Sequence, residues 1–321
     1  MASLNSKIAE LLLSYKENPI FAIESLFSVK LDDQQRSLVL GACAPNSRVA
    51  VKSGQGCGKT ATLTWLTMYF LPTLEDCRIL ITAPSAQQLN RVFHSEFLKM
   101  YARLPEVFKG FFDIKKESIH IKGKEYQMAS LVTGNPSNIE GLQGGHATNY
   151  IIMGDEASGL DELVFDTLLG TLGTGDGKFI LTSNPVRNSG RFYEIFANEN
   201  PRWNRITFSG LKSAQISKGW LDDMGAMYSE MDDNWQIRVL GNFGRFGEQQ
   251  FIPSSLIETC ANNWIEHRVY ANYPKIAGID VARFGADQTV FSLRQGPKIL
   301  DITRYSNLDT MEVAARVAVI S

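Results

Sequence analysis

From about residue 48 onward, short runs of apolar residues alternate with stretches in which apolar residues recur at helical spacing. This alternation is typical of βαβ units, in which helices cover a parallel sheet. The predicted strands are RVAVKS (48–53), RILITAP (78–84), ASLVTGN (129–135), NYIIMGDEA (149–157) and KFILTSNP (178–185). Each ends in small or polar residues, and the carboxyl ends of parallel strands line the ligand crevice of such a sheet. The pattern therefore predicts an α/β fold with a ligand site at that edge.

The pattern changes on both sides of this region. Residues 3–28 favour two helices, and residues 219–243 favour further helical structure after the segment NPRWNRITFSG. A loop-rich joint at 244–263 leads to consecutive strands at 275–285, 288–296 and 298–305 and then to a helix. A change from βαβ units to consecutive strands marks a domain boundary, which we place near residue 260. We expect three regions, at 1–200, 201–262 and 263–321.

The overall charge narrows the choice of partners. The chain has 321 residues and a formal net charge of −2, with 32 basic and 34 acidic residues. Nucleic-acid binding would therefore depend on a local basic patch.

The four cysteines, at 43, 57, 77 and 260, lack metal-binding spacing, which indicates free thiols in a reducing compartment. No apolar run is long enough for a membrane span, and Glu10 interrupts the first one, so we expect neither a membrane partner nor a signal peptide.

The segment SGQGCGKT at 53–60 fits the phosphate-binding P-loop at each fixed position except the first, where serine replaces glycine. Its glycines allow the backbone to curl with its N–H groups around phosphates, and the next helix points its N-terminus at the same anion. Lys59 would reach the β- and γ-phosphates, and the Thr60 hydroxyl would bind Mg²⁺. The alternative is a glycine-rich turn without a ligand. The predicted nucleotide-binding residues of the loop are Ser53, Gly54, Gln55, Gly56, Cys57, Gly58, Lys59 and Thr60.

Two further strands end in polar groups. Asp155 and Glu156 follow the strand at 149–155, as the Walker B acids do in P-loop proteins. We expect Asp155 to help bind Mg²⁺ and Glu156 to polarise the attacking water. Two acids after a strand otherwise commonly cap a helix. Thr182, Ser183 and Asn184 end the next strand, where they could contact the γ-phosphate or its water, although a simple strand end explains them equally well.

The ordered motifs identify a family. The segments LDDQQRSLVL, ITAPSAQQ, GGHATNYIIMGDEASGL, FILTSNPVRNSGRFYEIF and GIDVARFGADQTV occur at about residues 20–320 in the order seen in large terminase subunits of tailed bacteriophages. The chain resembles these ATP-driven motors, which package double-stranded DNA into a procapsid. The resemblance implies a RecA/ASCE-like P-loop ATPase domain at 1–200 and a lid or linker subdomain at 201–262. It also implies the incomplete beginning of an RNase H-like nuclease domain at 263–321.

The same resemblance assigns roles to residues. Gln35, or its neighbour Gln34, would contact adenine, and residues 182–184 would form the motif that couples hydrolysis to movement. An arginine finger would stabilise the transition state. Arg91, Arg187 and Arg191 are the candidates, and the sequence does not choose among them.

For the nuclease region, the resemblance suggests Asp280 and Asp287 as ligands for Mg²⁺ or Mn²⁺. A two-metal site needs several further carboxylates from later strands and helices, and because only 47 residues follow Pro274 (321 − 274), we expect the carboxylate set to be incomplete. We therefore expect this chain not to cut DNA.

By resemblance the cofactors are ATP and Mg²⁺. The partners would be double-stranded DNA, held through its phosphates, the portal protein, the small terminase subunit and further copies in a ring. The place of action would be the host cytoplasm, at the portal of the procapsid. Two other functions remain open: a superfamily-2-like helicase or translocase, and a catalytically inert portal-binding remnant.

Overall fold

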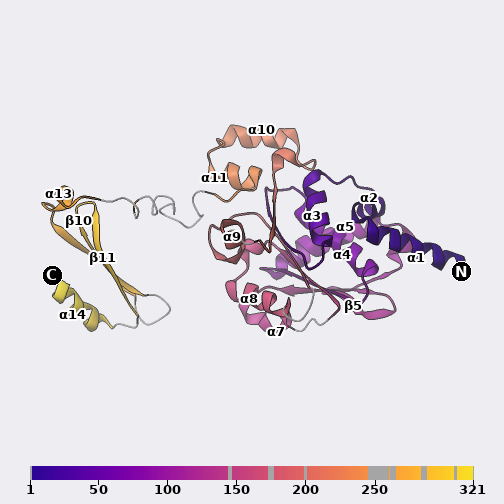
Figure 1. The fold of residues 1–321 in the computed structure, drawn as a ribbon, viewed down its shortest axis with the longest axis horizontal. Coiled ribbons are helices and arrows are strands. Elements are labelled where there is room, and N and C mark those ends of the chain that lie inside the picture. The colour runs from indigo at the N-terminus through magenta and orange to yellow at the C-terminus, as the bar shows by residue number, and fades with distance from the viewer. Residues whose placement is uncertain are drawn as a thin grey trace. The chain divides into compact units, whose positions relative to one another are not determined.

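The computed structural model describes residues 2–143, 147–172, 177–198, 201–244, 260, 265–282, 288–306 and 309–320. The chain divides into two compact units, Met1–Pro253 and Ser254–Ser321. The first unit contains an α/β sheet and the second a small antiparallel sheet (Figure 1). Within the described residues, no helix is long and apolar enough to cross a membrane.

The large unit is built on an eight-stranded sheet, counted over the described residues, in the order β3-β4-β5-β2-β6-β7-β1-β8. Six consecutive strands of this order, β5-β2-β6-β7-β1-β8, run parallel to one another. The bounds of the strands are β1 Arg48–Ser53, β2 Cys77–Ala83, β3 Phe112–Ile114, β4 Ser118–Ile121, β5 Lys124–Thr133, β6 Asn149–Asp155, β7 Lys178–Ser183 and β8 Asn204–Phe208. The five predicted strands are confirmed, and β1 has the predicted bounds.

One edge of this sheet differs from the expectation. Strands β3 and β4 pair antiparallel with each other and with β5, so the sheet is mixed rather than wholly parallel. Both are short, and an antiparallel pair needs only a tight turn, here at 122–123, instead of a helical crossover. β8 was not predicted as a strand, and it lies parallel beside β1 at the opposite edge.

Helices cover both faces of the sheet. One face packs against α1 Ala2–Glu17, α2 Pro19–Phe27, α3 Asp33–Cys43, α4 Lys59–Thr73 and α5 His94–Arg103, and the other packs against α7 Ile139–Leu142, α8 Glu162–Thr171 and α9 Gly190–Ala197 (Figure 1). Alternate residues of each strand enter the two cores: Ile151 and Met153 of β6 face the first layer, and Ile152 faces the second. α4 is buried from residue 62 to residue 71, so apolar side chains and small threonines occur on all of its sides.

Short elements complete the large unit. They are the π-helical turns η1 Gln88–Phe93 and η6 Gln236–Leu240, the 3₁₀ turns η2 Pro136–Asn138, η3 Ala157–Gly159 and η5 Gly210–Lys212, and the helices α6 Glu106–Lys109, α10 Lys218–Met227 and α11 Asp233–Trp235. α10, α11 and η6 share a small core of Met224, Trp235 and Val239. They lie within the expected lid region. The boundary of that region at 200 remains a prediction, since the contacts place these helices in the same compact unit as the sheet.

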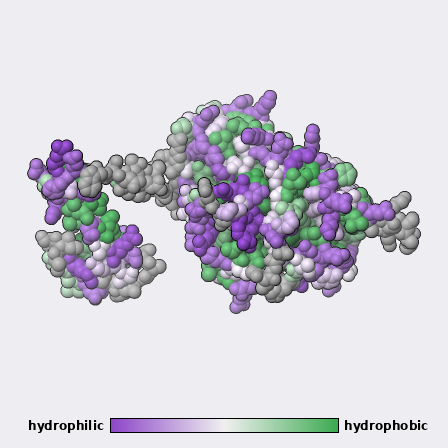
Figure 2. Space-filling view, in the orientation of Figure 1, coloured by the Kyte–Doolittle hydropathy of each residue, from purple (hydrophilic) through white to green (hydrophobic). Residues whose placement is uncertain are grey.

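The small unit contains α13 His267–Tyr270, β9 Lys275–Asp280, β10 Thr289–Gln295, β11 Lys298–Tyr305 and α14 Thr310–Ile320. The three strands pair antiparallel in the order β11-β10-β9, which confirms the predicted consecutive strands. Phe291 and Val313 form its described core. Ile276, Ile279, Ile299 and Ile302 remain exposed on the sheet, where Figure 2 shows hydrophobic residues on the visible face. The loop-rich joint predicted at 244–263 lies outside the described residues except for Gly244 and Cys260.

Candidate active site

The P-loop connects β1 to α4, as the sequence predicts. Gly56 and Gly58 have φ values of +73° and +83°, in the left-handed region that glycine adopts without strain. Gly58 is the N-cap residue of α4, so the helix N-terminus opens directly onto the loop. Cys57 is buried within the loop, and burial raises the pKa of its thiol. This side chain therefore behaves as a small packed group and not as a reactive thiolate.

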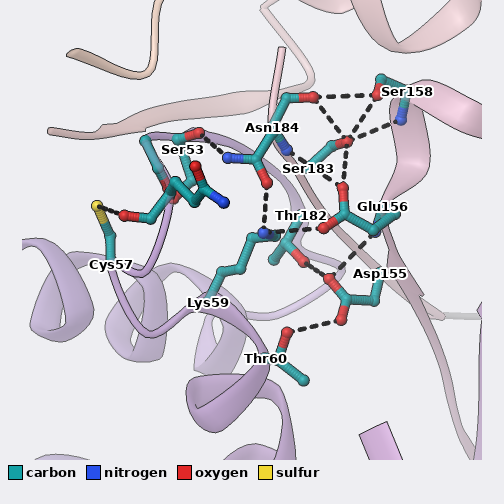
Figure 3. Close-up of polar contacts among 12 residues, drawn as sticks. Ser53, Cys57, Lys59, Thr60, Asp155, Glu156, Ser158, Thr182, Ser183 and Asn184 are labelled. Carbon is teal, nitrogen blue, oxygen red and sulfur yellow. Dashed lines mark hydrogen bonds and ion pairs between the residues drawn. The ribbon is translucent and has the colours of Figure 1, made fainter. Parts of the chain in front are cut away.

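The carboxyl end of β6 brings Asp155 to the first turn of α4. The Thr60 hydroxyl donates a hydrogen bond of 2.7 Å to Asp155 Oδ2, and the Thr182 hydroxyl donates one of 2.8 Å to Oδ1 (Figure 3). Asp155 is only 4% exposed, and burial raises its pKa against the opposing effects of Lys59 and the two hydroxyls. Thr60 and Asp155 thus place a hydroxyl and a carboxylate oxygen, both of the ligand types that Mg²⁺ prefers, at one point.

Glu156 lies next to the P-loop lysine. Its Oε1 is 2.9 Å from Lys59 Nζ, and its Oε2 accepts a hydrogen bond of 3.3 Å from Ser183 Oγ (Figure 3). Glu156 has φ +52° and ψ +43°, a left-handed conformation that is unusual for a residue with a side chain. Such a backbone costs on the order of 1 kcal/mol or more, and it persists only where surrounding contacts hold it. Here it turns the carboxylate away from the strand direction and toward Lys59.

The strand end at 182–184 connects both motifs. Asn184 Oδ1 accepts a hydrogen bond of 2.7 Å from Lys59 Nζ, and Asn184 Nδ2 donates one of 2.7 Å to the Ser53 carbonyl (Figure 3). Since β7 lies between β1 and β6, its end can reach the P-loop on one side and the acid pair on the other. The structure therefore brings together the P-loop, the two acids and all three residues of the predicted coupling segment.

Sequence reasoning missed Ser158. Its hydroxyl lies 2.8 Å from Ser183 Oγ and donates a hydrogen bond of 3.0 Å to the Asn184 carbonyl, and its backbone N–H donates one of 3.1 Å to Ser183 Oγ. The only signal was its position two residues after Glu156, in a turn that the sequence did not resolve. Ser158 fixes Ser183 and thereby supports the carboxylate of Glu156.

The structure distinguishes the two glutamines of α3. The side-chain amide of Gln34 is used by the backbone of Ser209, which donates to its Oε1 at 2.6 Å and accepts from its Nε2 at 3.2 Å. Gln35 is fully buried, its Oε1 accepts from the Asp32 N–H, and its Nε2 has no partner among the described atoms. This Nε2 points at the P-loop, 2.7 Å from where a β-carbon on Gly58 would lie. Of the two, Gln35 has the donor available for a ligand.

Of the three candidate arginines, Arg91 lines a cavity together with the loop. A cavity of about 400 Å³ is lined by residues 56–61 and by one side of η1 and α5: Arg91, Val92, Ser95, Glu96 and Lys99. Arg191 instead forms ion pairs with Asp166 and Glu194 on the surface. Arg187 is exposed.

The expected nuclease residues are only partly described. Asp280 ends β9 and is exposed, whereas Asp287 lies outside the described residues. Within the described part of the chain, no group of three or more His, Cys, Asp or Glu side chains could hold a metal ion. The pairing of Thr60 with Asp155 does not contradict this, because P-loop proteins complete the magnesium coordination with phosphate and water.

The fold and this site define a P-loop ATPase architecture in which an extra strand, β7, separates the P-loop strand from the Walker B strand. A scan against protein-family models finds no match. A curated protein of Enterobacteria phage P7, named probable terminase large subunit, is 23% identical over 96% of this chain. The chain spans 66% of the length of that relative.

Solved structures agree on the fold. The large terminase ATPase domain of Thermus phage P74-26 covers 70% of this chain, with 98% of that domain matched, 16% identity and a TM-score of 0.54. The HK97 bacteriophage large terminase covers 90% of this chain and is itself covered to 66%, with 15% identity and a TM-score of 0.54. A large terminase from a thermophilic bacteriophage, solved with ADP, covers 90% of this chain and is itself covered to 74%, with 13% identity and a TM-score of 0.54. The resemblance to phage large terminase subunits is thereby confirmed.

Proposed function

We propose that this chain is the ATP-hydrolysing part of a phage DNA-packaging motor of the large terminase type. The observation that carries the proposal is the convergence of the P-loop and the acid pair: Thr60 contacts Asp155, and Lys59 contacts Glu156. These four groups come from segments about a hundred residues apart in the sequence. Their arrangement matches what hydrolysis of a nucleoside triphosphate requires, namely a phosphate cradle, a magnesium site and a base for water.

The loop and the helix N-terminus would bind the phosphates. The amides around Gly56 and Gly58, together with the N-terminus of α4, supply donors, and Lys59 supplies a positive charge. Thr60 and Asp155 would hold Mg²⁺, which when bound neutralises charge on the β- and γ-phosphate oxygens. ADP is bound in the thermophilic phage terminase of similar fold, which supports a nucleotide as the ligand of this loop.

Glu156 is the base that we assign to the attacking water. In the structure its carboxylate is occupied by Lys59 and Ser183. A γ-phosphate attracts Lys59 more strongly than the carboxylate does, because it carries more negative charge. Substrate binding would therefore draw Lys59 away and free one carboxylate oxygen to take the proton of water. The same movement of Lys59 would break its hydrogen bond to Asn184 Oδ1.

Two further residues complete the proposed site. The unpartnered Nε2 of Gln35 is a donor for a ring nitrogen of adenine, since a buried donor without a partner costs about 1–3 kcal/mol and a base would satisfy it. Arg91 is the arginine that we select for stabilising transition-state charge, because it lines the same cavity as Lys59 and Thr60.

The larger setting is also part of the proposal. The partners would be double-stranded DNA, the portal protein, the small terminase subunit and neighbouring copies in a ring, in the host cytoplasm at the procapsid. DNA would be held through phosphates, so binding would weaken as salt is raised. Cleavage of DNA by this chain is not expected, and that expectation remains a prediction.

The decisive experiment measures ATP hydrolysis by the purified chain with Mg²⁺. We expect steady-state phosphate release, and we expect Glu156→Gln to lower kcat by about 10²–10⁴-fold. ADP binding, followed by calorimetry, should remain in that variant. Glu162→Gln, an exposed acid in the first turn of α8, is the matched control and should leave kcat unchanged.

Two results would contradict the proposal. Phosphate release that is equal in wild type and Glu156→Gln would favour the inert portal-binding remnant. Strand separation of a forked duplex by the wild-type chain would favour the helicase. High protein concentration or added portal should be included, because a ring can be needed for full activity.

A further inference from the structure

The segment that returns from the lid helices to the sheet is attached to the P-loop. We call residues 236–243 the return segment. The Gln55 N–H donates a hydrogen bond of 2.7 Å to the Arg238 carbonyl. Gly54 lies so close to the return segment that a β-carbon on it would meet the Val239 carbonyl oxygen at 2.6 Å. A β-carbon on Gly241, whose φ is +67°, would lie 2.6 Å from the Gly54 nitrogen. The entrance of the P-loop and the return segment are therefore in backbone contact.

Lys52 adds a side-chain link on the same stretch of β1. Its ammonium donates a hydrogen bond of 2.8 Å to Asn242 Oδ1. It also lies 5.8 Å from the ring centre of Phe196 in α9 and 5.7 Å from that of Phe243. Both distances suit a cation–π interaction. Among the described residues, no carboxylate forms an ion pair with Lys52, and burial lowers its pKa.

The acceptor of this hydrogen bond is itself held in place. Asn242 Nδ2 donates a hydrogen bond of 3.1 Å to Gln236 Oε1, and the Asn242 N–H donates one of 2.8 Å to the Gln236 carbonyl. Gln236 Nε2 donates in turn to the Glu230 carbonyl at 2.7 Å. The amide of Asn242 is thus oriented with its oxygen toward Lys52. A chain of hydrogen bonds therefore leads from β1 to the turn between α10 and α11.

We propose that Lys52 is a positioning residue that fixes the return segment against the entrance of the P-loop and so sets the loop for nucleotide binding. This inference rests on the proposed ATPase function. Lys52 touches none of the proposed reacting groups, whereas Gln55 and Gly54, which the return segment contacts, belong to the phosphate-binding loop. Loss of the link would loosen the loop and leave the Glu156 network intact. It would therefore weaken nucleotide binding with little effect on the chemical step.

The first test replaces Lys52 by methionine, which keeps the apolar length of the side chain and removes the ammonium. We expect Lys52→Met to raise KM for ATP, and the Kd for ADP, by about tenfold while kcat changes less than about twofold. Lys52→Arg retains the charge and the stacking on both rings, and it should restore most of the affinity. A role in general stability would instead change the thermal midpoint without this division between KM and kcat.

Lys178→Met is the matched control. Lys178 is also half-buried, burial also lowers its pKa, and its ammonium also donates to oxygens, here the carbonyls of Cys43 and Ala44. It lies at the opposite end of its strand from the site, because β7 begins at Lys178 and ends at Ser183. We expect its removal to leave KM for ATP unchanged.

A second pair of variants acts on the partner and remains informative if Lys52→Met folds poorly. Asn242→Leu removes the acceptor and should raise KM, whereas Asn242→Asp keeps an acceptor for the ammonium, loses only the hydrogen bond to Gln236, and should raise KM less. In the double variant Lys52→Met/Asn242→Leu, the increase in KM should not exceed that of Lys52→Met alone, because both changes remove one link. Independent, multiplying effects would overturn the inference.

The wild type separates this inference from the proposed function. If the wild-type chain binds ADP and hydrolyses ATP but Lys52→Met has the same KM and Kd, the positioning role is wrong and the ATPase proposal stands. If the wild type neither binds nor hydrolyses nucleotide, both are wrong.

Discussion

Asp155 and Asp280 each end a strand, β6 in the large unit and β9 in the small unit. Asp155 is 4% exposed and accepts hydrogen bonds from Thr60 and Thr182. Asp280 is exposed, as are all six residues of its strand. The two segments, MGDEAS and GIDVAR, look alike as sequence: an apolar strand, a glycine and an acid.

The difference comes from what surrounds each strand. β6 lies between β2 and β7, with helices on both faces, so its end meets polar groups from two other segments, the first turn of α4 and the end of β7. Within the described residues, β9 pairs on one side only, with β10. A carboxylate acquires a defined geometry and a shifted pKa when neighbours enclose it. The comparison teaches that the motif supplies the chemical group, whereas packing makes it a site.

The largest expected effect concerns the strands that carry these acids. Ile151 of β6 is fully buried, and Ile279 of β9 is 38% exposed. We expect Ile151→Ala to lower the free energy of unfolding by about 3 kcal/mol, because it leaves a cavity in a packed core. Ile279→Ala should cost about 1 kcal/mol or less. Denaturant titration with a probe in each unit measures both. If both variants lost the same free energy of unfolding, β9 would be covered in solution, and the difference in burial between the two strands would not hold.

The next effect concerns the support of Glu156. Ser183 Oγ contacts Glu156 and is fixed by Ser158. Ser183→Ala should lower kcat for ATP by about tenfold, an effect of about 1.4 kcal/mol, with KM little changed, because the substituted group positions the base. Thr167→Ala, an exposed hydroxyl of α8 that donates only to its own helix, is the control and should have no effect. A rise in KM without loss of kcat would assign Ser183 to binding instead.

Burying the ionised carboxylate of Asp155 lowers the free energy of unfolding, and a neutral substitution should reveal this cost. Because burial raises the pKa of Asp155, the ionised carboxylate destabilises the folded chain above that pKa, and this cost disappears as pH falls through it. Asp155→Asn removes this charge and should therefore stabilise the fold at neutral pH, and it should abolish ATP hydrolysis because it removes a carboxylate oxygen that would hold Mg²⁺. The stabilisation should shrink as pH is lowered. Thermal unfolding across pH measures it, and a variant less stable than wild type at neutral pH would contradict the assignment.

The same difference between local pattern and packing explains which parts of the fold and the site could be predicted from the sequence. β1 was predicted residue by residue, since a strand buried on both faces reads as a continuous apolar run before a glycine loop. β3 and β4 were missed because they are short and because their strand conformation depends on antiparallel pairing, of β3 with β4 and of β4 with β5. Within the site, the spacing of residues in the sequence was sufficient to predict the phosphate-binding loop and the two acids. The choice of Gln35 over Gln34, and the role of Ser158, depend on side-chain direction, which spacing does not encode.

The smallest expected effect is that of Asp280→Asn. An exposed side chain at a strand end, such as that of Asp280, usually changes stability by no more than about 0.5 kcal/mol. Neither kcat for ATP nor the free energy of unfolding should change measurably. Duplex DNA incubated with wild type or variant in Mg²⁺ or Mn²⁺ should remain intact in both. If the wild type cut DNA and the variant did not, Asp280 would belong to a working metal site. Asp155 and Asp280 would then both be metal ligands, and they would differ only in how far the surrounding protein encloses them.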